Sequence, residues 1–219
     1  MTSRILPLHW SAHSTSLRTC LLIMLIFRFH PIAKAQTNLP APTVPNAAYQ
    51  PITGTERFKW VVRSTIGPQS LAAGVWSAGW GTAFNSPEEY GPHWEGFAKR
   101  YGMRLTGVST GNTIEASLGM LWKEDPRYVL SQEKKLMRRV GHAADLTFRT
   151  RYGDGSLHPA YARYAGNVGN NFLSNTWRVE SESSVSAALT RTALGFAGKF
   201  GSNLFEEFWP SFLRLLKGS

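Results

Sequence analysis

The stretch Gln69-Ser-Leu-Ala-Ala-Gly-Val-Trp-Ser-Ala-Gly-Trp-Gly-Thr-Ala-Phe84 indicates how this chain folds. Its small residues Gly74 and Ala78 fall on one side of a helix, whereas Trp76 and Trp80 project from another. Glycine inside a helix costs about 1 kcal/mol relative to alanine, so a helix that keeps several glycines usually gains close approach to a neighbour. The pattern predicts a helix over 69–84 with one tightly packed face and one bulky face.

Two further segments repeat this pattern and add a charge to it. Glu115 follows a row of glycines at 107 and 111 in a predicted helix over 93–122, and Arg191 lies among small residues in a predicted helix over 183–208. A close neighbour would remove both charges from water, and an unpaired buried charge costs several kcal/mol. We therefore expect an ion pair between Glu115 and Arg191, with Arg104, Arg149 and Arg163 as the alternative partners if the topology differs.

The fold class that follows is all-α, a compact bundle of about six helices with glycine-rich contacts between helices. Prolines fall between the long segments, as expected where proline ends helices. No segment shows convincing strand alternation. The predicted helices cover 55–65, 69–84, 87–90, 93–122, 132–150, 160–177, 183–208 and 211–217.

The beginning of the chain has the features of a secretory signal peptide. An apolar run from Cys20 to Phe27 follows Arg4 and Arg18 and leads to Ala33 and Ala35, the small residues that signal peptidase needs. The alternative is a retained anchor, but a spanning helix needs roughly 20 apolar residues. We predict a signal peptide over 1–35, a Pro-rich disordered spacer over 36–53 and a helical domain over 54–219.

Composition narrows the chemistry of the mature chain. Cys20 is the single cysteine, so cleavage would leave no disulfide, thiolate metal site or thiol nucleophile. The leader carries four basic residues and no acid, which leaves 20 basic against 14 acidic residues. This surplus suits an anionic lipid surface or an envelope polymer as partner, with simple solubility as the alternative, whereas nucleic acid is not expected outside the cytoplasm.

Two tracts without charged residues, 64–87 and 164–177, raise the question of whether the domain inserts into a membrane. The many Gly, Ala and Ser residues argue against a membrane span, and a mean hydropathy of −0.22 suits a soluble fold. We therefore expect a compact bundle that touches a membrane surface, with full insertion as the alternative. The predicted helix 132–150 offers a contact face, which resembles that of an interfacial helix or an ordinary surface helix. Its basic residues are Lys135, Arg138, Arg139 and Arg149.

Signals for catalysis are weak. Gly107-Val-Ser-Thr-Gly111 matches a nucleophile elbow, but that motif needs a strand before the serine. No histidine of the predicted mature chain is paired with another at the spacing that a metal site requires. An exported glycan-cleaving hydrolase would use a desolvated glutamate, Glu95 or Glu115, as general acid. No catalytic, cofactor-binding or metal-ligating residue is assigned, and no cofactor is expected.

Three segments, 96–102, 122–128 and 201–210, resemble an uncharacterised family of exported bacterial helical proteins. The resemblance extends from about Arg57 to Pro210 and implies secretion without an assigned activity. The sequence thus predicts an exported, periplasmic or cell-envelope protein that acts as a structural or interaction module. The glycan hydrolase remains the alternative.

Overall fold

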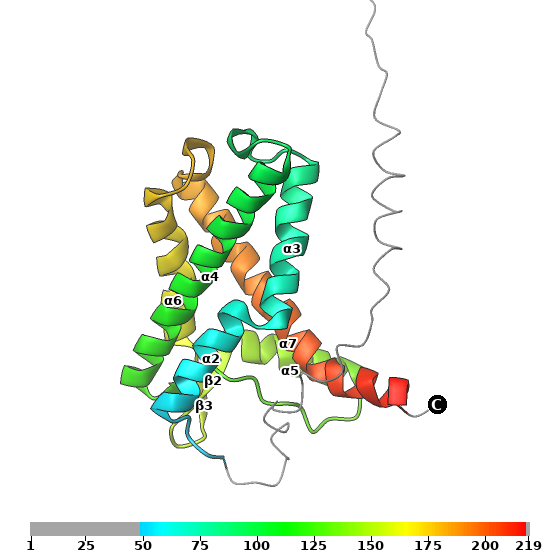
Figure 1. Cartoon of the computed structure of the whole chain (residues 1–219). Coiled ribbons are helices and arrows are strands. Elements are labelled where there is room, and N and C mark those ends of the chain that lie inside the picture. Colours follow the sequence, from blue (N-terminus) through cyan, green and yellow to red (C-terminus); the bar gives the residue numbers. More distant parts are fainter. Residues whose placement is uncertain (1–48, 218–219) are drawn as a thin grey trace, which may run out of the picture. The chain divides into compact units, whose positions relative to one another are not determined.

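The computed structural model describes residues 49–217, and these residues are mostly helical, with a small three-stranded sheet (Figure 1). The coarse prediction of a helical fold is confirmed. The predicted signal peptide and most of the predicted spacer lie outside the described residues.

Three helices form the first half of the domain. They are α2 (Gly54–Ile66), α3 (Pro68–Ala83) and α4 (Trp94–Trp122), with a short 3-10 turn, η1 (Glu88–Tyr90), before α4. A capping box starts α2, because Thr53 and Glu56 satisfy each other's free backbone N–H groups. Gly67 ends α2 in an extended conformation, and Pro68 then occupies the first turn of α3, where its missing N–H is harmless.

A small antiparallel sheet follows α4 and was not predicted. Its strands are β1 (Glu124–Asp125), β2 (Arg149–Tyr152) and β3 (Leu157–Pro159), and β2 lies in the middle. The helix α5 (Leu136–Phe148) runs directly into β2, so the prediction of helix over 132–150 is wrong at both ends. Glu124 pairs with Tyr152, and Thr150 pairs with His158.

The second half consists of α6 (Tyr161–Leu173), the short turns η2 (Ser174–Thr176) and η3 (Glu180–Glu182), and α7 (Val185–Lys217). The sequence predicted a break in the last helix at Pro210, but α7 continues through it. Proline removes one backbone hydrogen bond from a helix and crowds the preceding turn. Next to this weakened turn, a guanidinium nitrogen of Arg139 donates to the carbonyl oxygen of Glu207.

Glycines mark the crossings between helices, as predicted. The helix α4 lies between α3 and α6, and α7 packs on α5 and α6 (Figure 1). A Cβ on Gly166 of α6 would lie 2.8 Å from the carbonyl oxygen of Gly111 on α4, and one on Gly195 of α7 would lie 2.2 Å from Oδ1 of Asn167. Gly198 differs, because a Cβ there would meet nothing within 4 Å.

The last residues of the predicted spacer are held against the sheet. The Tyr49 hydroxyl donates to Oδ2 of Asp125 at 3.1 Å, and Nη2 of Arg127 donates to the carbonyl oxygen of Gln50 at 2.9 Å. Tyr49 and Gln50, which the sequence assigned to the disordered spacer, therefore contact the folded domain.

Candidate functional site

The described residues reverse the usual distribution of polar and apolar side chains. The largest fully buried side chains are Glu207, Asn203, Thr147 and Ser174. Buried apolar positions are mostly alanine, such as Ala78, Ala143 and Ala188. Large apolar side chains are exposed on every long helix, although such residues normally form the core.

A row of exposed apolar side chains lies on α3. We call it the Trp face and define it as Val75, Trp76, Trp80 and Phe84. The aromatic members are 58%, 59% and 64% exposed, and their rings stack along the helix with centroids 6.1 and 4.8 Å apart. The opposite side of α3 is buried at Gly74 and Ala78, which confirms the predicted packed and bulky faces.

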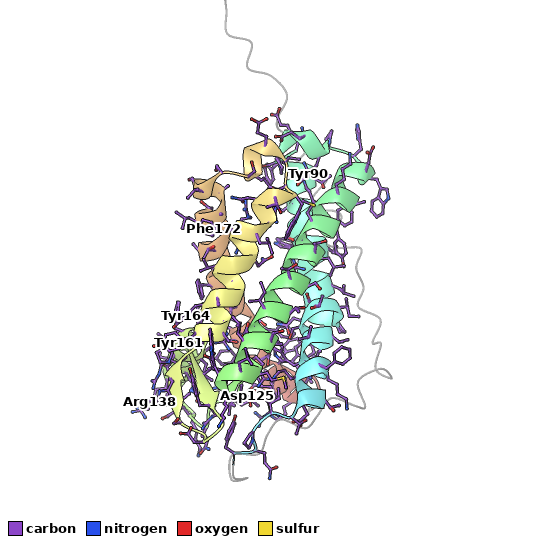
Figure 2. All side chains as sticks on the ribbon, turned by 90° about the vertical axis from the view of Figure 1, so that its left-hand side faces the viewer. Tyr90, Asp125, Arg138, Tyr161, Tyr164 and Phe172 are labelled. Atoms are coloured by element: carbon purple, nitrogen blue, oxygen red, sulfur yellow. The ribbon has the colours of Figure 1, made fainter. Side chains whose placement is uncertain are left out.

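The outer side of α6 also carries apolar groups. Tyr161 and Phe172 are 55% and 38% exposed, and Figure 2 shows both side chains projecting from α6 on one side of the bundle. Tyr164, between them, contacts the ring of Phe196 on α7, with centroids 5.8 Å apart. Exposed apolar surface is therefore not confined to the Trp face.

Glu115 is buried but pairs with Arg163 instead of Arg191. Nε of Arg163 lies 3.0 Å from Oε1 of Glu115, and these side chains are 6% and 13% exposed. Arg163 also donates to the carbonyl oxygens of Leu146 and Thr147 at 2.7 and 3.2 Å. A further bond goes to the carbonyl oxygen of Arg149 at 3.3 Å, so four acceptors surround one guanidinium. This arrangement corrects the predicted Glu115–Arg191 pair in favour of one of its named alternatives.

Arg191 binds the loops at the other end of the bundle. Its guanidinium donates to the carbonyl oxygen of Asn171 at 2.9 Å and also to Oδ1 of Asn175 and the carbonyl oxygen of Glu182. Burial lowers the pKa of Arg191. The residue therefore closes the turns between α6 and α7 and is not available to Glu115.

Arg139 does not belong to a solvent-facing basic surface, which corrects part of the predicted membrane-contact face. Its Nε lies 2.6 Å from Oε1 of Glu207, whose side chain is 0% exposed. The other carboxylate oxygen of Glu207 accepts from the Tyr128 hydroxyl at 2.8 Å and from the backbone N–H of Ser131 at 2.9 Å. This network joins α5, the 126–135 segment and α7.

The other three members of that face are exposed, but two are paired with acids. Arg138 lies 3.3 Å from Glu133, and Arg149 lies 3.4 Å from Asp145. Lys135 is exposed just before α5 begins. An open cavity of about 310 Å³ adjoins this region. Its lining includes both acids and bases: Glu133, Lys134, Arg139, Glu207 and Arg214.

Neither glutamate proposed for glycan cleavage has the surroundings of a general acid. Glu95 is exposed and bonded to Lys99 at 2.7 Å, and this hydrogen bond lowers its pKa, whereas a general acid needs a raised pKa. Glu115 is held by Arg163. Burial does raise the pKa of Glu124, but the cavity between Glu124 and Glu115 is too small for a water molecule.

Other catalytic or metal-binding signals also lack the required geometry. Ser109 of the elbow-like motif lies inside α4, with no strand before it. Nε2 of His142 lies 2.8 Å from the carbonyl oxygen of Val129, and that of His158 lies 2.9 Å from Oγ of Ser156. Residues 49–217 contain no group of His, Cys, Asp and Glu side chains arranged to hold a metal ion.

Sequence reasoning missed Glu207 and Glu124. Glu207 lies four residues after the buried Asn203 and eight after Lys199, so a polar row at helical spacing was its one signal. Glu124 accepts from the backbone N–H of Ala162 and the hydroxyl of Tyr152, and no local pattern indicates either contact.

Comparison with protein-family models, curated proteins and solved structures finds no match for this chain. Within the described part of the chain, no helix is both long and apolar enough to cross a membrane.

Proposed function

We propose that this chain is an exported protein of the bacterial cell envelope that acts as a non-catalytic interaction module on a membrane surface. The single observation that supports this proposal is the reversed distribution of side chains. Polar contacts and small residues occupy most of the fully buried positions, and many of the large apolar side chains are exposed.

The interior accounts for the stability of such an arrangement. Arg163, Arg191 and Arg139 each bind backbone carbonyl oxygens in addition to side chains. Small residues at the crossings allow close backbone contact, as in helix pairs that do not depend on large apolar side chains. The exterior apolar groups are therefore free to contact an apolar phase.

Export is supported by the leader pattern over 1–35, and envelope retention by the exposed apolar surface together with the basic surplus. A protein with large exposed apolar patches is expected to bind a partner, a membrane or a ligand. Among the described residues, neither Glu95 nor Glu115 has the surroundings of a general acid, which favours this module over the glycan hydrolase.

Cell fractionation combined with mass measurement tests the proposal. We expect the chain in the envelope fraction, with a mass that corresponds to cleavage after Ala35. Release from the membrane pellet should require detergent and not salt alone, because apolar contact is insensitive to screening. Recovery of the uncleaved chain in the cytoplasmic fraction would contradict the proposal.

A further inference from the structure

The Trp face is more than half exposed in the described structure. The helix α3 packs on α4 and α2, its buried residues are Gly74 and Ala78, and the rings of Trp76, Trp80 and Phe84 stack on one another along its outer side. No charged residue occurs between Arg63 and Glu88. The segment that carries the aromatic row therefore contributes no charged side chain of its own.

The preceding helix, α2, also has an exposed apolar row, with positive charge beside it. Phe58, Val62 and Ile66 recur every fourth residue on α2 and are 68%, 39% and 54% exposed. Lys59 and Arg63 each follow one of these residues directly, and neither forms a salt bridge among the described residues. Apolar groups beside free basic groups are typical of helices that lie at an anionic membrane interface.

The size and composition of the Trp face favour lipid over a second copy of the chain. Aromatic side chains bury about 150–250 Å² each, so its three aromatic residues, somewhat over half exposed, present roughly 300–450 Å². A stable protein interface buries about 800 Å² on each partner. Trp is also enriched at the level of lipid head groups.

The exposed apolar groups on other helices also favour lipid over a protein partner. A single protein partner would cover one face, but Tyr161 and Phe172 of α6 are exposed as well (Figure 2). A lipid interface adapts to whichever apolar surface reaches it. The absence of a spanning helix in residues 49–217 is compatible with a helix that lies in the interface plane.

We infer that the Trp face, with the adjoining Phe58, Val62 and Ile66 of α2, is the surface that docks on an anionic lipid bilayer. This inference rests on the proposed function and assigns the contact to α2 and α3 instead of the predicted basic face of α5. The Trp and Phe side chains enter the boundary between head groups and acyl chains. Lys59 and Arg63 meet lipid phosphates.

Vesicle flotation of the full chain, produced with its leader and purified from cells, tests the inference. The probes are phosphatidylcholine vesicles with and without phosphatidylglycerol. Trp76→Ser combined with Trp80→Ser should lower the partition coefficient by about 10- to 100-fold, because each substitution removes roughly half of the transfer free energy of a buried aromatic side chain. Lys59→Gln combined with Arg63→Gln should weaken binding only where phosphatidylglycerol is present.

Leu136→Ser combined with Met137→Ser is the matched control, because these α5 residues are 63% and 75% exposed. It should leave flotation unchanged. Circular dichroism and urea unfolding verify that each variant is folded. Unchanged flotation of the Trp variant, or an equal loss in the control, would overturn the inference.

Two other outcomes separate this inference from the proposed function. Self-association that the Trp substitutions abolish, without vesicle binding, would overturn the inference in favour of a second copy. Envelope recovery in the fractionation experiment together with flotation that depends on α5 would keep the proposed function and reject the Trp face. Failure of the chain to reach the envelope would reject the proposed function, while flotation would still decide whether this face binds lipid.

Discussion

Substitution of Arg139 by glutamine is expected to destabilise the fold strongly, although the sequence placed this residue on a solvent-facing surface. The change removes the 2.6 Å contact with Glu207 and the donor to the Glu207 carbonyl oxygen. It also removes a guanidinium that lies 4.4 Å from the ring centroid of Phe208. Breaking a buried ion pair by removing one partner typically costs about 3–5 kcal/mol.

We expect a cost near the lower end of that range, about 3 kcal/mol, because Tyr128 and Ser131 still donate to Glu207. Arg138→Gln is the control. Its pair with Glu133 is exposed, so its loss should cost at most about 1 kcal/mol. Urea unfolding followed by circular dichroism measures both values, with an unchanged slope showing that the folded state is retained.

A double substitution isolates the pair itself. Arg139→Gln combined with Glu207→Gln should cost less than the sum of the two single changes, because the second change removes the unpaired charge. Equal stabilities of Arg139→Gln and Arg138→Gln would refute the assignment of Glu207 as a buried, ion-paired carboxylate. Vesicle flotation should not respond to Arg139→Gln in the folded protein.

Three further predictions concern other parts of the domain. Gly166→Ala should lower the free energy of unfolding by about 1–3 kcal/mol because its Cβ would strike backbone of α4, whereas Gly198→Ala, in open space, should raise it by about 0.5–1 kcal/mol. Arg163→Gln should lower the free energy of unfolding, measured with urea, by about 3–5 kcal/mol, and adding Glu115→Gln to the same chain should restore part of this loss. If the losses from the two substitutions simply added, the pairing would be contradicted. Burial and the hydrogen bond to Glu124 raise the pKa of Tyr152 from its ordinary value of 10.0 to about 12. The neutral Tyr152 hydroxyl therefore stabilises the fold fully below pH 10, and this stabilisation is lost as the pH rises through about 12. Alkaline unfolding should lose this pH dependence in Tyr152→Phe, and an ultraviolet titration that shows Tyr152 ionising near pH 10 in the folded protein would refute it.

Helices and their faces could be predicted because their signals are local. Glycine spacing identified the packed side of α3, and Gly67-Pro68 marked the junction with α2. The sheet could not be predicted in this way. Its strands have two to four residues, too few for alternation to be recognised, and β2 depends on pairing with the distant β1, where Asp125 faces Arg151 and Glu124 faces Tyr152.

Ion-pair partners depend on topology, which local patterns do not specify. Arg163 and Arg191 both lie near small residues, and only the crossing of α4 and α6 brings Arg163 to Glu115. Glu207 follows another glutamate and precedes Phe208, so the sequence presents it as a surface charge. Its burial depends on Arg139, 68 residues earlier in the chain.

The membrane depth of a spin label on α3 shows whether the Trp face enters the bilayer. Cleavage would remove Cys20, the single cysteine, so a nitroxide can be attached at one chosen site, Trp76→Cys, with Arg138→Cys on α5 as the reference. With phosphatidylglycerol vesicles, we expect the label at position 76 to become accessible to oxygen and protected from a water-soluble relaxant, while position 138 stays aqueous. Equal aqueous accessibility at both positions in the bound protein would contradict the account.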